Sequence, residues 1–331
     1  EAQALGVNTV RLTFPDAGGE HGETTEGDLE RLPDLLGDLG DALDLLEARG
    51  MGAIVTLFNR HDYPGAYQDD TKRWRDRTKT LRFAERFGED PRVLMWDLAN
   101  EPPLGNEETR TATVLWLEEI RDVLTAHPVR QPITVGMVNH YEARMVEHLG
   151  EIISFHCYGR FDRTSVERSG SETHDGVKYY VGTYCGASVE YLRNELGRRP
   201  IVLQEFGWPD APSRWNSGGR PPEHPWGLWS YPEDAETMDH FYREVLDQMA
   251  VRDVAGAVAW TIQDADAHHF GLLDEDYRRK REASDHSAYT IFRAWGDERA
   301  RPFRWTEGEP APDPGCPAGE RRVEDGRCLP S

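Results

Sequence analysis

Short apolar runs alternate with longer amphipathic stretches along most of the chain. Seven runs have the length and apolar content of buried strands, and they cover residues 9–13, 53–58, 93–98, 133–138, 152–155, 201–205 and 254–262. Between them, apolar residues recur at helical spacing. The helices predicted in this way cover residues 29–46, 72–88, 107–126, 142–149, 186–197, 234–251 and 285–296. Repeated strand–helix units predict a parallel sheet.

The fold class that this order predicts is α/β, and the architecture is a (β/α)8 TIM barrel. Such a barrel closes with eight strands, whereas the pattern supplies seven. Because residues 1–6 resemble the end of a helix that leads into the first strand, we expect the chain to be N-terminally truncated, with its first strand upstream of residue 1. An open seven-stranded sheet is the alternative. We assign residues 1–300 to the barrel and residues 301–331, rich in Pro, Gly and Glu, to a tail.

The composition limits which classes of molecule this chain is expected to bind. A formal net charge of -22 over 331 residues argues against nucleic acid, because binding a phosphate backbone needs clustered cations. No apolar run approaches the roughly 20 residues of a membrane span. We therefore expect no membrane span. We also expect the protein to be a monomer.

The four cysteines form two candidate pairs. Cys316 and Cys328 bracket a short loop in the tail, which a disulfide would order. Cys157 and Cys185 flank a long loop and are either a second disulfide or two independent buried thiols. Neither pair has the spacing of a zinc site. Disulfides would indicate a secreted or periplasmic protein, whose signal peptide is not in this chain.

Two strands end in a glutamate. Glu101 follows the strand at 93–98 and is itself followed by two prolines, and Glu205 ends the strand at 201–205. The carboxyl ends of barrel strands meet at one pocket. Cleavage of a glycosidic bond needs a carboxylic acid that protonates the leaving oxygen and, in retaining enzymes, a carboxylate nucleophile about 5–5.5 Å away. Asn100 can bind a sugar hydroxyl beside the reacting carbon. The alternative is two carboxylates in salt bridges on a rim.

The chain resembles family 5 of the glycoside hydrolases, in the clan of (β/α)8 retaining enzymes. The resemblance lies in WDLANEP at 96–102 and, much later, LQEFGW at 203–208. It implies that Glu101 is the acid/base and Glu205 the nucleophile. Further matches to the family's site residues are Arg11, His156, Tyr158 and Trp260, with Asn139 and His140 less firmly placed. By general chemistry, Arg11 and Tyr158 can stabilise the Glu205 carboxylate, His156 can orient Glu101 or bind a hydroxyl, and Trp260 can stack on a sugar ring.

One position separates the possible substrates. Many family members have a histidine at the end of their third strand, where this chain has Asn59 and His61 as candidates. Asn59, followed by Tyr63 and Pro64, is more similar to the β-mannanases of the family than to its cellulases. Both β-mannan and β-glucan remain open as substrates, as do endo and exo action.

A loop rich in aromatic residues could extend the binding site. Trp208, Trp215, Trp226 and Trp229 are candidate platforms for further sugar units, and a cluster that stiffens the loop is an equally good interpretation. We interpret His268 and His269 as rim residues rather than metal ligands.

Taken together, the pattern predicts a retaining β-glycoside hydrolase that cleaves β-1,4-linked glycans by double displacement, without a cofactor or metal. The alternatives are a non-catalytic carbohydrate-binding barrel, an exo-acting β-glycosidase of the same clan, and a metal-dependent barrel hydrolase. The last would need His and Asp ligands at several strand ends, and most strand ends here lack them.

Overall fold

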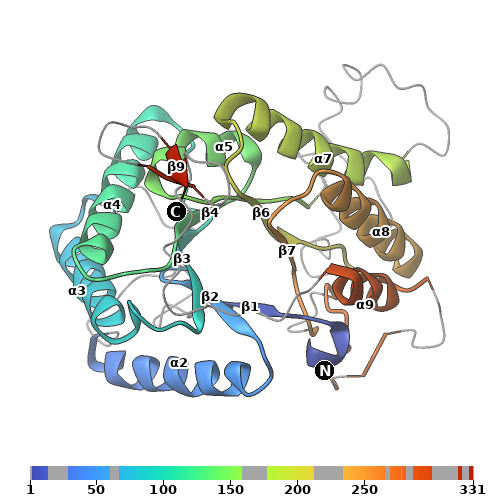
Figure 1. Ribbon diagram of the computed structural model, residues 1–331, viewed down its shortest axis with the longest axis horizontal. Coiled ribbons are helices and arrows are strands. Elements are labelled where there is room, and N and C mark those ends of the chain that lie inside the picture. The colour runs from blue at the N-terminus through green and yellow to red at the C-terminus, as the bar shows by residue number, and fades with distance from the viewer. Residues whose placement is uncertain are drawn as a thin grey trace. The chain divides into compact units, whose positions relative to one another are not determined.

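The computed structural model describes residues 2–13, 29–59, 67–158, 177–211, 234–264, 269–276, 278–280, 286–299, 320–322 and 328–330. Seven strands form one sheet in which spatial order equals chain order (Figure 1). They are β1 (Thr9–Thr13), β2 (Gly52–Thr56), β3 (Val93–Asn100), β4 (Ile133–Met137), β5 (Ile153–His156), β6 (Ile201–Phe206) and β7 (Gly256–Ala259). Every pairing in this sheet with a described register is parallel.

Helices connect successive strands. They are η1 (Ala2–Leu5), α2 (Leu32–Glu47), α3 (Asp70–Phe87), α4 (Glu107–Thr125), α5 (His140–Met145), η3 (Glu147–Leu149), α7 (Val177–Leu196), α8 (Ala235–Val251) and α9 (Ala288–Arg299). Parallel strands in sequential order, each followed by a helix, are the topology of a (β/α)8 barrel. The predicted fold class is confirmed, and the described residues supply seven of its strands. The strand that we expect upstream of residue 1 stays a prediction.

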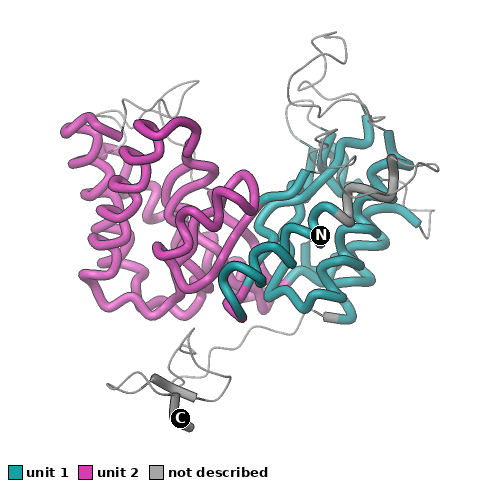
Figure 2. Tube along the Cα trace, turned by 90° about the horizontal axis from the view of Figure 1, so that it is seen from above, with its two compact units in different colours: residues 1–7, 156–197, 201–301 teal, residues 8–155, 198–200, 302–331 magenta. Residues whose placement is uncertain are grey.

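The chain divides into two compact units (Figure 2). Unit 1 comprises residues 1–7, 156–197 and 201–301, and unit 2 comprises residues 8–155, 198–200 and 302–331. Strands β1 to β4 and most of β5 belong to unit 2, whereas β6 and β7 belong to unit 1.

In unit 2, side-chain caps fix where α3, α4 and α5 begin. The Asp69 carboxylate accepts a hydrogen bond from the backbone N–H of Lys72 at the start of α3. Asn106 caps α4 in the same way, and Asn139 caps α5 by accepting from the N–H of Glu142 at 3.0 Å. Asn139, a less firmly placed candidate for the sugar site, thus has a structural role here.

In unit 1, helices α7, α8 and α9 lie side by side (Figure 1). The end of β6 buries Phe206 against Phe241 and Tyr242 of α8 and Phe292 of α9. Trp208 is 6% exposed and stacks near Phe241, with ring centroids 5.7 Å apart. This aromatic cluster anchors the exit of β6, where Glu205 lies.

Several element boundaries differ from the prediction, and two of them lie near the candidate site. Strand β7 ends at Ala259 rather than at 262, because residues 261–264 bond to residues 270–273 instead of continuing along β6. Helix α7 begins at Val177 rather than at 186, inside a stretch that the sequence pattern left as loop. Its first residues include valine, tyrosine and glycine, whose weak intrinsic helix propensity hides the helix in the sequence.

The tail contains a short antiparallel hairpin of β8 (Glu320–Arg322) and β9 (Cys328–Pro330), with Arg322 opposite Cys328. Cys316 lies outside the described residues, so its disulfide with Cys328 stays a prediction, as does the division at residue 300. None of the helices in the described part of the chain is long and apolar enough to span a membrane.

Candidate active site

Glu101 lies immediately after β3, in unit 2. Its backbone has a φ of 47°, a left-handed conformation that few residues other than glycine adopt. The Glu101 N–H donates to the carbonyl oxygen of Gly136 on β4 at 2.7 Å, which holds this turn in place. Backbone strain of this kind is often found at functional sites. The half-buried Glu101 is therefore set at a fixed point where β3 ends.

A buried ion pair supports the same strand end. The Arg11 guanidinium donates to Asp97 Oδ2 at 2.7 and 3.1 Å and to Asn100 Oδ1 at 2.8 Å. Asp97 also accepts from the Thr56 hydroxyl and from the Gly136 N–H, each at 2.8 Å. The side chains of Arg11 and Asp97 are 5% and 0% exposed. This network fixes the amide of Asn100, one residue before Glu101.

Asp97 is a supporting residue that the sequence reasoning missed. The signal was present, because an aspartate inside an otherwise apolar strand needs a partner when it is buried. Arg11 was expected to stabilise Glu205, which belongs to the other unit. That expectation stays a prediction, and within unit 2 Arg11 binds Asp97 and Asn100.

In unit 1, Glu205 occupies the end of β6 with its side chain 8% exposed. The Tyr158 hydroxyl donates to Glu205 Oε2 at 2.6 Å, as predicted. Nδ1 of His156 lies 3.4 Å from the same oxygen. The sequence pattern placed His156 beside Glu101 or a substrate hydroxyl, and the contact with Glu205 is an additional finding. The Glu205 carboxylate is thus buried, with one hydrogen-bond donor and one imidazole beside it.

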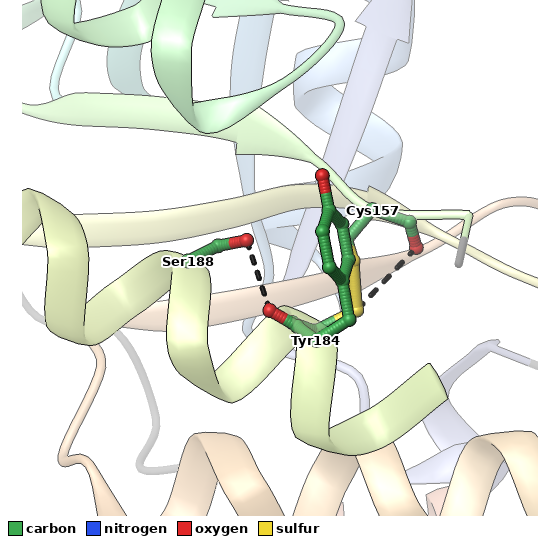
Figure 3. Close-up of a disulfide and its surroundings, with 4 residues drawn as sticks. Cys157, Tyr184 and Ser188 are labelled. Atoms are coloured by element: carbon green, nitrogen blue, oxygen red, sulfur yellow. Dashed lines mark hydrogen bonds between the residues drawn. A yellow bond between two sulfur atoms is a disulfide. The ribbon is translucent and has the colours of Figure 1, made fainter. Parts of the chain in front are cut away.

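The residue between His156 and Tyr158 forms a disulfide. Cys157 is bonded to Cys185 of α7, with 5.9 Å between the Cα atoms (Figure 3). Both cysteines are buried, and the Cys157 N–H donates to the carbonyl oxygen of Glu205 at 2.9 Å. Of the two alternatives that the sequence left open, the structure therefore shows a disulfide and not two free thiols.

Trp260 follows β7, and its N–H donates to the carbonyl oxygen of Phe206 at 2.8 Å. The residue is 43% exposed although it directly follows a strand, and its peptide bond to Thr261 is cis. The exposed ring suits a sugar platform. Phe270, from the segment that follows, meets the Tyr158 ring edge-on with centroids 6.1 Å apart.

A second polar cluster in unit 1 centres on Lys280. Its ammonium group lies 2.7 Å from carboxylate oxygens of both Asp210 and Asp264, and His269 Nδ1 is 3.7 Å from Asp264. The two aspartates and His269 are arranged as metal ligands could be. Because the Lys280 ammonium already supplies the positive charge there, we assign the cluster to loop stabilisation.

The remaining predicted residues divide into three groups. Asn59 is exposed at the end of the segment after β2. Trp208 is buried against Phe241, so the packing interpretation replaces that of a sugar platform. The rest lie outside the described residues: His61, Trp215, Trp226, Trp229 and His268. Glu101 and Glu205 belong to different units, and their separation stays a prediction.

Residues 49–268, more than half of the chain, match the family described as GH family 5 beta-mannosidase-like. The chain belongs to this family. The resemblance to glycoside hydrolase family 5 in the sequence is thereby confirmed. No curated protein sequence matches the chain.

Solved structures with the same fold include several glycosidases. The exo-beta-1,4-mannosidase Op5Man5 from Opitutaceae bacterium strain TAV5 has a TM-score of 0.62 at 17% identity, over 89% of this chain and 53% of that one. The Bifidobacterium dentium beta-glucuronidase, solved with coumarin-3-O-glucuronide, has a TM-score of 0.60 at 17% identity, over 89% of this chain and 41% of that one. A GH2 beta-galacturonidase from Eisenbergiella tayi has a TM-score of 0.57 at 16% identity, over 90% of this chain and 46% of that one. This chain therefore spans about half the length of these relatives, and the likeness concerns the fold.

Proposed function

We propose that this chain carries the catalytic barrel of a retaining β-glycoside hydrolase, with Glu205 as nucleophile and Glu101 as acid/base. The observation that carries the proposal is the buried Glu205 carboxylate, to which Tyr158 donates at 2.6 Å and beside which His156 lies. A donor at this distance holds the carboxylate in one orientation, as attack on an anomeric carbon requires. Membership of family 5 supports the same assignment.

Cleavage proceeds in two displacements. Glu101 gives its proton to the glycosidic oxygen while Glu205 attacks the anomeric carbon, so the C–O bond to the leaving group breaks and a glycosyl ester forms. Glu101, now a carboxylate, takes a proton from water as that water attacks the same carbon and releases Glu205. The product keeps the β configuration.

The substrate class that we propose is the β-mannosides, cleaved from the chain end. The family description supports mannose, and Op5Man5 is an exo-acting β-1,4-mannosidase on the same fold. The exposed ring of Trp260 offers an apolar face for the C–H face of a pyranose. β-Glucan and endo action, which the sequence left open, become outcomes of the test.

We further propose that the protein works in an oxidising compartment, either outside the cell or in a periplasm. The Cys157–Cys185 disulfide supports this location, because such bonds persist where thiols are not kept reduced.

A panel of aryl β-glycosides tests the activity. Hydrolysis of a nitrophenyl β-mannoside above the matching β-glucoside and β-glucuronide is expected, and proton NMR of the first product should show the β anomer. Release of the α anomer would contradict the retaining mechanism. Turnover of internally labelled mannan without release of mannose would replace exo by endo action.

Substitution separates the two carboxylates. Glu205→Gln should lose nearly all turnover on every substrate. Glu101→Gln should retain much more activity on a dinitrophenyl glycoside than on a phenyl glycoside, because a good leaving group needs little protonation. Equal losses in both variants on the dinitrophenyl substrate would show that the roles are misassigned. The expected carboxyl separation is about 5–5.5 Å.

A further inference from the structure

We infer that the Cys157–Cys185 disulfide is a positioning element for the nucleophile, and not only a brace for the fold. The inference rests on the proposed function of Glu205. Its starting point is the order of three consecutive residues. His156 and Tyr158 both contact Glu205 Oε2, and Cys157 between them is bonded to Cys185.

Strand geometry explains this order. Successive side chains of an extended chain point to opposite sides. If His156 and Tyr158 face Glu205, the Cys157 side chain points away from it, toward α7. Figure 3 shows Cys157 at the strand end, joined to α7 beside Tyr184 and Ser188. The disulfide thus holds residues 156–158 from the side opposite to Glu205, while His156 and Tyr158 contact Glu205 from the other side.

The segment needs such a fastening, because β5 ends at His156. Immediately beyond this point, the Cys157 N–H donates a backbone hydrogen bond to the carbonyl oxygen of Glu205. Tyr158 lies two residues beyond the end of the strand. The covalent bond to α7 therefore restrains the Tyr158 backbone from one residue away.

Helix α7 is a firm anchor at this point. Cys185 and Val189 are 0% exposed, and α7 packs along α8 within unit 1. The Ser188 hydroxyl donates to the carbonyl oxygen of Tyr184 at 3.0 Å, in the same turn as Cys185 (Figure 3). Movement of the Cys157 backbone would require either movement of this packed turn or loss of the bridge.

The consequence is kinetic. A misplacement of about 1 Å in a reacting constellation can cost on the order of 100-fold in rate. His156 is held within β5, but without the bridge Tyr158 would sample positions that no longer orient the Glu205 carboxylate. We expect the double variant C157A/C185A to lose about 10- to 100-fold in kcat, with a much smaller change in KM.

A double-mutant cycle with Tyr158→Phe separates positioning from general stability. If the bridge acts through Tyr158, removing it from the Tyr158→Phe protein should lower kcat by only about threefold or less, because the contact it positions is already gone. A loss of the same factor in both backgrounds would overturn the inference. All four proteins should be assayed well below their melting temperatures, with folding checked by circular dichroism.

Two further measurements keep the outcome decisive. Met249→Ala, at a buried position of α8, should lower stability while leaving the bridge intact, and it should leave kcat within about twofold. If C157A/C185A fails to fold, the wild type treated with a phosphine reductant takes its place, with thiol titration confirming reduction. Activity should then fall and return on reoxidation with oxidised glutathione, and full activity of the reduced protein would overturn the inference.

Failure of the proposed function looks different. In that case the oxidised wild type would hydrolyse no aryl β-glycoside, and the cycle could not be measured at all. An active wild type whose kcat is insensitive to the bridge would contradict only the positioning role.

Discussion

The phenolic hydroxyl of Tyr158 donates a 2.6 Å hydrogen bond to Oε2 of Glu205, across 47 residues of sequence. The acceptor lies at the end of β6, and the donor lies two residues beyond the end of β5. This contact defines one wall of the candidate site, because it fixes the orientation of a buried carboxylate. Substitution of Tyr158 tests this contact. Two further substitutions test the buried Arg11–Asp97 pair near Glu101 and the close approach of Gly207 to Trp260.

Tyr158→Phe should lower kcat/KM on aryl β-mannosides by about 10- to 100-fold, because one charge-stabilising donor is removed while the ring remains. Steady-state kinetics measure the loss. Tyr242→Phe is the matched control, since Tyr242 is buried in α8 and its hydroxyl has no hydrogen-bond partner among the described residues. That control should keep full activity. Equal activity of Tyr158→Phe and wild type would remove Tyr158 from the site.

Asp97→Ala should lower the free energy of unfolding by about 3–5 kcal/mol, because it removes the carboxylate that the buried Arg11 guanidinium contacts at 2.7 Å. Urea denaturation measures the change. Glu85→Ala, which breaks an exposed pair with Arg82, should cost less than about 1 kcal/mol. A small effect at Asp97 would show that Arg11 finds another partner in the variant.

Gly207→Ala should both destabilise the protein and reduce activity, because an added Cβ would overlap the carbonyl oxygen of Trp260. The two strand exits that carry Glu205 and Trp260 would then move apart. Gly105→Ala is the control, since a Cβ added there would meet none of the described residues within 4 Å. Thermal unfolding and kinetics on one aryl β-mannoside check both proteins, and an unchanged Gly207→Ala protein would refute the close approach.

Burial lowers the pKa of His140 to about 4. In the unfolded chain a histidine titrates with a pKa near 6.5. Well above pH 6.5, the His140 imidazole is neutral in both the folded and the unfolded protein. Below pH 6.5, the unfolded protein binds a proton there that the folded protein does not, so the free energy of unfolding falls as the pH falls toward 4. Between about pH 7.5 and pH 5, this residue should account for roughly 2 kcal/mol of lost stability.

Urea unfolding of the wild type and of His140→Leu at these two pH values tests this effect. The variant should lose less stability on acidification than the wild type by that amount. An identical pH dependence of the two proteins would show that His140 becomes protonated without unfolding.

Several features of this protein follow from the sequence alone. Strand–helix alternation predicted the parallel sheet, because apolar runs and helical spacing are local signals, and a (β/α)8 barrel orders its strands along the chain. The strand-end position of Glu101 and Glu205 and the partnership of Tyr158 with Glu205 could also be inferred, since the fold brings strand ends together and the family resemblance supplied the roles.

Other features depended on contacts between distant residues. Arg11 pairs with Asp97 because both are buried on strands of the same sheet, and a single sequence does not show which carboxylate an arginine meets. Trp208 is buried against Phe241 of α8, whereas the sequence left a sugar platform and a stiffening cluster equally open. The early start of α7 and the choice of a disulfide over free thiols likewise depend on packing, which overrides local propensity and fixes the distance between Cys157 and Cys185.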